Sequence, residues 1–247
     1  MQDLNAFKAD GFVEVSRFCS AGELESIESA LRHFIRHTIP DLPPEHVFYE
    51  DKSAPESLKQ IQRMHEHADF FRDFMDDKPR RLAEELLEEA VVGKNLQYFN
   101  KPPGISRATP AHQDGQYFML EPCHALTMWM ALDPVDEENG CVRYVRGSHL
   151  LGLRPHGRTQ TLGFSQGITD FGSAPDLDNE VSCPAKPGDL LAHHALTIHR
   201  ADSNKSPTRS RRALGFIFYS AKARENTTNH RNYQQDLASA MAAAGKI

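Results

Sequence analysis

The sequence lacks several features that would assign a protein class at once. Its 247 residues include only four cysteines (Cys19, Cys123, Cys141 and Cys183), which are far apart and form no CxxC pair. This spacing excludes a zinc-ribbon pattern and a disulfide framework, so we expect a reducing, cytoplasmic setting. No segment repeats along the chain.

Long apolar runs and excess positive charge are also missing. The longest apolar stretch, Cys123–Leu132, is interrupted by His124 and Thr127 and is shorter than the roughly 20 residues of a membrane span. The formal net charge is −6, which argues against nucleic acid as a partner. The first residues contain no apolar segment typical of a signal peptide. We therefore expect neither a membrane nor a nucleic acid partner.

The chain is rich enough in apolar residues, at 39%, to form one ordinary globular domain. We predict a mostly helical region over residues 1–95, short strands between turns over 96–220, and a last helix over 221–247. Residues 151–178 form a long, irregular, glycine-containing insert. Such loops commonly cover binding sites, so we predict a lid there.

Individual elements follow from local patterns. Ser20 and Glu23 form a capping box before a helix that ends near Pro40. Further amphipathic helices are predicted over Glu56–Phe74 and Pro79–Ala90. The predicted strands are Phe12–Val15, Leu96–Asn100, Ala125–Leu132, Val142–Val145, Asn179–Ser182, Leu190–Ala192, Thr197–His199 and Arg212–Tyr219.

The tripeptide His112-Gln113-Asp114 is the central chemical signal. Residues i and i+2 of an extended segment point to the same side, so the imidazole and the carboxylate can bind one metal ion. His199 follows a strand-like run and supplies a second imidazole. Two histidines and one carboxylate form the facial triad of non-haem Fe(II) oxygenases. The alternative, a polar surface turn, is common for an isolated HxD.

A cluster of arginines follows the distal histidine. Arg211 stands at the start of a predicted strand, where a guanidinium can bind a carboxylate through two parallel hydrogen bonds. The alternative interpretation is an exposed basic run made of Arg209, Arg211 and Arg212.

An ordered set of motifs carries a family resemblance. These are Asp10–Val13, Asn100–Gly104, Thr109–Asp114, Trp129–Asp133, Glu138–Cys141, Gly147–His149, Pro187–Asp189 and the run from His194 through His199 to Arg211. Together they resemble the phytanoyl-CoA dioxygenase family of Fe(II)/2-oxoglutarate oxygenases over about residues 5–220. The resemblance implies a mainly β fold with a double-stranded β-helix (jelly-roll, cupin-like) core and N-terminal helices packed outside it, in a single oxygenase domain over 1–247.

The resemblance also implies roles for particular residues. His112, Asp114 and His199 match the iron ligands, and Arg211 matches the arginine that binds the far carboxylate of 2-oxoglutarate. Thr109, Trp129 and Gln97 match positions that line the co-substrate pocket. O₂ is then the second co-substrate, and the products include succinate and CO₂.

Two departures from the family pattern leave alternatives open. The spacing from His199 to Arg211 is slightly long, so Arg209 or Arg212 can take the place of Arg211. Ala201 stands where many relatives carry a small hydroxyl residue. His194 is a candidate to line the metal site, with a packed strand histidine as the alternative.

The substrate is less well defined by the sequence. Arg143, Arg146, Arg154, His156 and Arg158 favour a small polar, anionic molecule, with scattered surface charges as the alternative. The motifs look most like a bacterial branch of the family, and this suggests hydroxylation of 2-aminoethylphosphonate or a similar aminoalkylphosphonate. A cupin-like protein that binds a metal or a small molecule without turnover, and a zinc or manganese hydrolase, are the competing hypotheses. The oligomeric state is not predicted.

Overall fold

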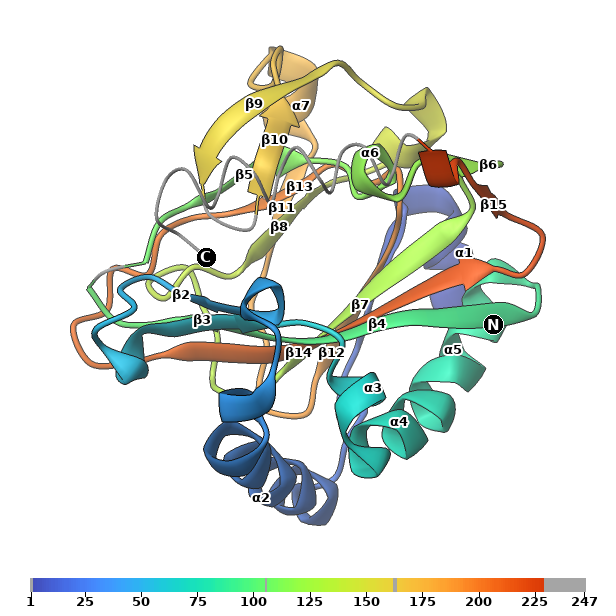
Figure 1. Ribbon diagram of the computed structural model, residues 1–247. Helices are drawn as coiled ribbons and strands as arrows, with labels where there is room; N and C mark the ends of the chain where they lie inside the picture. Colours follow the sequence, from blue (N-terminus) through green and yellow to red (C-terminus); the bar gives the residue numbers. More distant parts are fainter. Residues whose placement is uncertain (1, 105, 162–163, 229–247) are drawn as a thin grey trace.

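Two antiparallel sheets face each other in the computed structural model, which describes residues 2–104, 106–161 and 164–228 (Figure 1). The larger sheet has the strand order β1-β12-β7-β14-β4-β3-β2, and the smaller one has the order β11-β8-β13-β5. Apart from β2, β3 and β4, which follow one another along the chain, neighbours in a sheet are distant in the sequence, as expected for a jelly roll. The predicted mainly β fold with helices packed outside is confirmed.

The strands of the large sheet are β1 (Phe12–Val15), β12 (Leu190–His194), β7 (Ala125–Ala131), β14 (Arg211–Ser220), β4 (Val91–Lys101), β3 (Leu58–Ile61) and β2 (Val47–Tyr49). Those of the small sheet are β11 (Glu180–Cys183), β8 (Val142–Val145), β13 (His199–Ala201) and β5 (Thr109–His112). Two further pairs are β9 (His156–Thr161) with β10 (Phe164–Ile168), and β6 (Leu120–Glu121) with β15 (Arg224–Glu225).

The helices lie mainly outside the sheets. They are α1 (Gln2–Asp10), α2 (Ala21–His37), α3 (Met64–His67), α4 (Asp69–Asp76), α5 (Lys78–Leu87), α6 (Gly115–Phe118) and α7 (Ala174–Asp178). Helices α2, α4 and α5 cover one face of the large sheet (Figure 1). The predicted capping box at Ser20 and Glu23 is present at the start of α2.

The large sheet is buried on both faces, and this explains the almost continuous apolar sequences of its central strands. On β14, Leu214 and Phe216 belong to the core shared with the helices, where the Phe216 ring lies 5.6 Å from that of Phe74. Ala213 points to the opposite face and packs with Trp129 between the two sheets. The space between the sheets holds the candidate site.

Three expectations about individual segments need correction or fall outside the structure. Glu56–Phe74 is not one amphipathic helix, because Leu58–Ile61 pairs with β4 as a strand and helix begins only at Met64. The insert 151–178 is more regular than expected, since it contains the β9–β10 hairpin and α7. The predicted C-terminal helix falls mostly on residues 229–247, outside the described part of the chain.

Among the described residues, no helix has the length and apolar character of a membrane span.

Candidate metal centre

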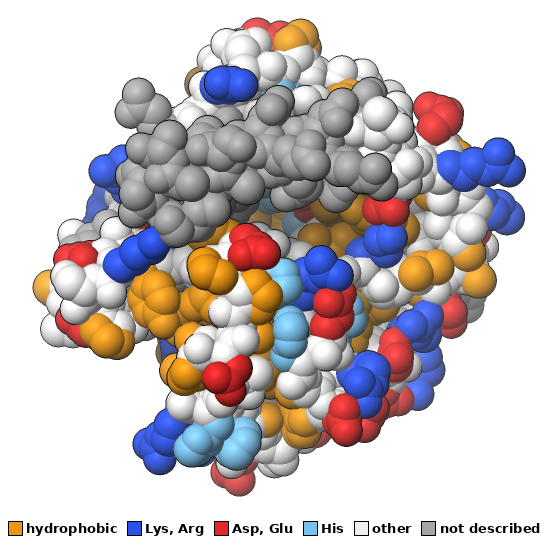
Figure 2. Space-filling model, viewed as in Figure 1, with side chains coloured by type: hydrophobic (Ala, Val, Ile, Leu, Met, Phe, Trp, Pro, Cys, Tyr) orange, Lys and Arg blue, Asp and Glu red, His pale blue; other side chains and the backbone are white. Residues whose placement is uncertain are grey.

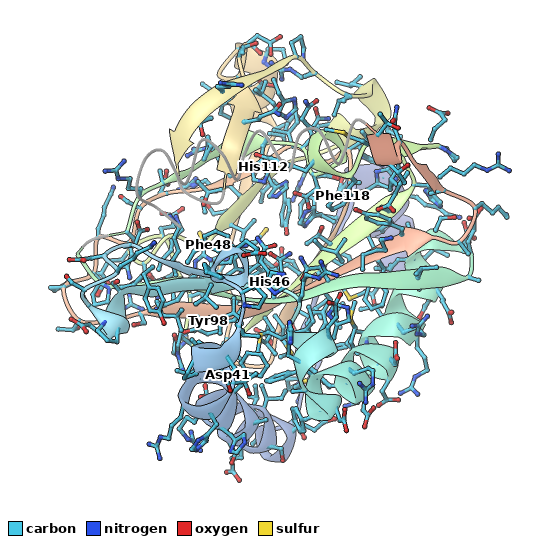
Figure 3. The ribbon with its side chains drawn as sticks, in the orientation of Figure 1. Asp41, His46, Phe48, Tyr98, His112 and Phe118 are labelled. Atoms are coloured by element: carbon cyan, nitrogen blue, oxygen red, sulfur yellow. The ribbon has the colours of Figure 1, made fainter. Side chains whose placement is uncertain are left out.

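The small sheet brings His112 and His199 together from two neighbouring strands. They are directly opposite each other in the β5–β13 register, and their ring centroids are 4.1 Å apart. Asp114 follows β5 at the start of α6, and one ligand atom from each of the three residues lies within 4.8 Å of the other two. Figure 3 labels His112 in the space between the sheets. The sequence-predicted triad is therefore a spatial cluster.

Hydrogen bonds orient both imidazoles with Nε2 toward the carboxylate. Nδ1 of His112 lies 2.8 Å from the Pro110 carbonyl oxygen, and Nδ1 of His199 lies 3.0 Å from that of Thr197. A ring that donates from Nδ1 leaves the Nε2 lone pair for a metal. The two Nε2 atoms are 3.5 and 3.7 Å from Oδ1 of Asp114. Ligands about 2.1 Å from one ion would be about 3 Å apart, so these two distances would each shorten by less than about 1 Å on metal binding.

The second carboxylate oxygen of Asp114 is held by the large sheet. Thr127 Oγ1 donates to Oδ2 at 2.5 Å, and His193 Nε2 lies 3.2 Å from the same atom. The other nitrogen of His193 lies 3.0 Å from the hydroxyl of buried Tyr144. These contacts leave Oδ1 as the atom directed at the two imidazoles.

The protonation states suit a cation. Burial opposes ionisation of Asp114, but His199, His112 and His193 together bring the pKa of its carboxyl well below the usual range. Burial and the neighbouring His112 and His193 lower the pKa of His199 well below its ordinary value. A carboxylate beside a neutral imidazole is the state that binds a metal without first releasing a proton.

A buried guanidinium faces the same space between the sheets. Burial raises the pKa of Tyr144 well above its usual value, and Asp114 and Arg211 both lie close enough to influence it. Arg211 is 5% exposed, and among the described residues it forms no ion pair with an acid. Its Nε donates to the Gly140 carbonyl at 3.0 Å, and the guanidinium lies 5.0 Å from the centroid of the Trp129 ring. Burial lowers the pKa of Arg211 to about 10. A buried cation in this state requires an anionic partner.

The neighbouring arginines are already paired. Arg209 binds Asp136 and Glu138 at the surface, and Arg212 binds Asp133 and Glu28. Of the three arginines that the sequence leaves as alternatives, Arg211 alone is buried among described residues without an acidic partner. The geometry therefore favours Arg211 as the anion-binding residue.

Two more predicted residues face the same space. Gln97 on β4 and Trp129 on β7 flank Gly215 of β14 in one row of the sheet, on the face that also carries Arg211. The Phe99 ring fills the space above Gly215, where a Cβ would lie only 2.6 Å from it.

On the small sheet, a bulge in β5 places Thr109 on the same face as His112. His112 is opposite His199 and Thr109 is opposite Ala201, so β5 has one more residue than β13 over this stretch. Because opposite residues of an antiparallel pair share a face, Thr109 lies on the face of His112.

Comparison with known proteins now decides the family. The phytanoyl-CoA dioxygenase (PhyH) family matches residues 7–213. The chain belongs to this family.

Its relatives include the peroxisomal phytanoyl-CoA dioxygenase of Mus musculus, which is 24% identical over 217 residues, 81% of this chain and 62% of the relative. Phytanoyl-CoA dioxygenase domain-containing protein 1 of Bos taurus is 31% identical over 179 residues, 71% of this chain and 58% of the relative. The chain thus spans about three fifths of the length of these curated relatives.

Among solved structures, the fold is similar to that of the epimerase SnoN in complex with Fe³⁺, alpha ketoglutarate and nogalamycin RO. The TM-score is 0.73 at 24% sequence identity, and the match covers 90% of this chain and 84% of that one.

Within this PhyH-family chain, some supporting residues were not identified from the sequence. Thr127 and His193 are opposite each other on β7 and β12, and both contact Asp114. No local sequence motif marks either residue, so they could not be found from the sequence. Of the two alternatives for His194, the structure supports the packed strand histidine. Its ring packs near His124 and His149, at 5.6 and 5.8 Å between centroids, because alternation along β12 turns it away from His193.

The expected cationic cluster is largely neutralised. Arg143 pairs with Asp202, Glu137 and Glu180, and Arg154 pairs with Asp170 and Asp176. Arg146 lies 4.0 Å from Asp10. Figure 2 shows charged groups of both signs intermixed on one face of the molecule. Of the four arginines, only Arg158 has no described acidic partner.

Proposed function

We propose that the protein is an Fe(II)/2-oxoglutarate-dependent dioxygenase that hydroxylates a C–H bond of a small polar molecule, with release of succinate and CO₂. One observation carries the proposal. The cluster of buried His112 with half-buried Asp114 and His199 lies between the sheets together with Arg211, a buried cation without a described acidic partner. The cluster fits a cation, and Arg211 fits an anion.

In this proposal each side chain has a defined task. His112, Asp114 and His199 hold the ferrous ion through three positions on one side and leave three positions for other ligands. Arg211 binds the far carboxylate of 2-oxoglutarate, and Trp129, Gln97 and Thr109 line the pocket around it. Iron with 2-oxoglutarate and O₂ supplies the oxidising chemistry, while the protein orients the reactants and excludes water.

The competing hypotheses predict different outcomes in a turnover assay. A zinc or manganese hydrolase would not consume 2-oxoglutarate. A binding protein without turnover would show metal and 2-oxoglutarate binding but no succinate. The cytoplasmic location remains a proposal from the sequence.

The substrate is proposed from the sequence motifs, with 2-aminoethylphosphonate or a similar aminoalkylphosphonate as the first compound to test. Most of the arginines that suggested an anionic substrate are paired with acids, so Arg158 is the remaining candidate to bind a phosphonate. It shares a strand face with His156 on β9.

The test is succinate formation by the purified protein with Fe(II), 2-oxoglutarate and O₂ against a panel of aminoalkylphosphonates, amino acids and acyl-CoA esters. We expect one class to accelerate succinate release above the substrate-free rate, with hydroxylated product in equal amount. If aminoalkylphosphonates give no acceleration, the substrate assignment is wrong. If 2-oxoglutarate is never consumed, the reaction class is wrong.

A further inference from the structure

Gln113, the residue between two of the proposed ligands, is fully buried, and its side-chain amide bridges two segments. Nε2 donates to the carbonyl oxygens of Leu196, at 2.7 Å, and Gly152, at 2.8 Å. Oε1 accepts from the backbone N–H of Arg154 at 2.8 Å. Leu196 lies in the turn between β12 and β13, three residues before His199, whereas Gly152 and Arg154 lie at the start of the insert.

The backbone of Gln113 forms a fourth hydrogen bond, which is the third to the insert. Its N–H donates to Nε2 of His156 at 3.1 Å. Nδ1 of His156 lies 2.8 Å from the Arg154 carbonyl oxygen, which fixes the ring with Nε2 as the acceptor. We call Gly152, Arg154 and His156 the docking segment. Three of the four bonds of Gln113 go to it.

The insert is also braced internally and at a second point. Arg154 binds Asp170 and Asp176, so the docking segment is tied to the rest of the insert. Gln116 Nε2 donates to Oε1 of Gln166 at 2.8 Å, which connects α6 to β10. This second contact joins the insert to α6, which begins just after Asp114, without using the side chain of Gln113. A variant on the insert side of this contact therefore leaves all four bonds of Gln113 in place and serves as a control.

From this geometry we propose that Gln113 is a positioning residue, which couples attachment of the docking segment to the placement of His112 and Asp114. A displacement of Gln113 must move both neighbours, since they are adjacent in the chain. Attachment of the docking segment therefore favours the arrangement of the triad that binds metal. The inference rests on the proposed function, because it takes the triad to be the metal site.

Coupling of this kind works in both directions. If attachment of the docking segment strengthens metal binding, metal binding must stabilise that attachment by the same factor. Hydrogen exchange measures this effect without turnover. Backbone amides of residues 152–158 should exchange more slowly in the wild-type protein after metal is added.

The decisive variants are Gln113→Met and His156→Phe. Gln113→Met keeps the length and volume of the side chain but removes its three amide bonds. His156→Phe removes one hydrogen bond by a change in the insert and leaves residues 112–114 unchanged. It therefore provides a second test if Gln113→Met does not fold. Gln166→Ala is the control, because it removes a side-chain amide bond from the insert at the second contact.

Metal affinity is measured anaerobically with Fe(II) and with Co(II), whose visible spectrum reports the ligand geometry. We expect Gln113→Met to bind roughly 10–100-fold more weakly, as for other residues that orient metal ligands. We also expect an altered Co(II) spectrum and loss of the metal-induced protection of residues 152–158. His156→Phe should give smaller changes of the same sign, and Gln166→Ala should leave metal affinity within about twofold.

The outcomes separate the two proposals. If the wild-type protein binds neither metal, the proposed function is wrong. If it binds metal and the Gln113→Met variant has the same affinity, spectrum and exchange protection, the coupling is wrong and the proposed function stands. If Gln166→Ala weakens metal binding as much as Gln113→Met, the effect is a general loss of insert stability and the coupling is again wrong.

Discussion

Replacement of Arg211 by methionine should change co-substrate binding and protein stability in opposite directions. The guanidinium is buried without a described acidic partner. Removing one partner of a buried charge pair costs about 3–5 kcal/mol, so the Kd for 2-oxoglutarate should rise by roughly two to three and a half orders of magnitude.

The protein without bound ligands should respond the other way. Burial lowers the pKa of Arg211 from 12.5 to about 10, and this corresponds to a cost of about 3 kcal/mol for keeping the charge in the folded state. Methionine relieves this cost but loses the bond to Gly140 and the contact with Trp129, together about 2 kcal/mol. The net change is a gain of about 1 kcal/mol in unfolding free energy.

The assay combines calorimetric titration of 2-oxoglutarate into the Fe(II)-loaded protein under nitrogen with urea unfolding of the metal-free protein. Arg212→Met is the matched control, because Arg212 is paired with Asp133 and Glu28. It should lose about 1–3 kcal/mol of stability with unchanged 2-oxoglutarate affinity. Nearly wild-type affinity in Arg211→Met, or a loss of stability as large as in Arg212→Met, would refute the reasoning.

Three further predictions follow from the site and its surroundings. Thr127→Val removes the hydroxyl that donates to Oδ2 of Asp114 and should weaken Fe(II) binding about tenfold; unchanged affinity in an anaerobic titration would contradict this role. Trp129→Leu removes the ring beside Arg211 and should raise the Kd for 2-oxoglutarate about 2–30-fold, while an unchanged Kd would exclude the contact as a contributor. Burial, with His124 and His149 nearby, lowers the pKa of His194 from 6.5 to about 3, so the unfolded state takes up a proton as pH falls from about 6.5 toward 3 and the folded state does not. Between pH 7 and 5 the free energy of unfolding of the wild-type protein should therefore fall by about 1–2 kcal/mol because of this group. Urea unfolding at the two pH values should show a smaller fall for His194→Phe, and an equal fall in both proteins would contradict the prediction.

Features that depend on short stretches were predicted well from the sequence. The capping box at Ser20 and the apolar period after it define α2, and both are local patterns. The HxD spacing predicted His112 and Asp114 on one side because alternation along an extended strand is a local property. The partner His199 was found through an ordered series of motifs, since the β5–β13 pairing joins residues 87 positions apart.

Features that depend on distant partners were not predicted. Whether an arginine is available as an anion site was open, because it depends on acids such as Asp133 and Asp136 that lie more than 70 residues from Arg212 and Arg209. That His193, and not His194, contacts Asp114 likewise depends on the register between β12 and β7. Leu58–Ile61 shows no strong strand pattern and becomes a strand through its pairing with β4.

The most direct test of the account is an anaerobic titration of the purified protein with Fe(II) and 2-oxoglutarate, followed by visible absorption. A chelated co-substrate on ferrous iron gives a charge-transfer band, so we predict a band that saturates at one equivalent of each component. The band should be absent in His199→Ala and should require far more 2-oxoglutarate in Arg211→Met. Saturating Fe(II) binding without any band in the wild-type protein, or an undiminished band in His199→Ala, would contradict the proposal that these residues form an iron and 2-oxoglutarate site.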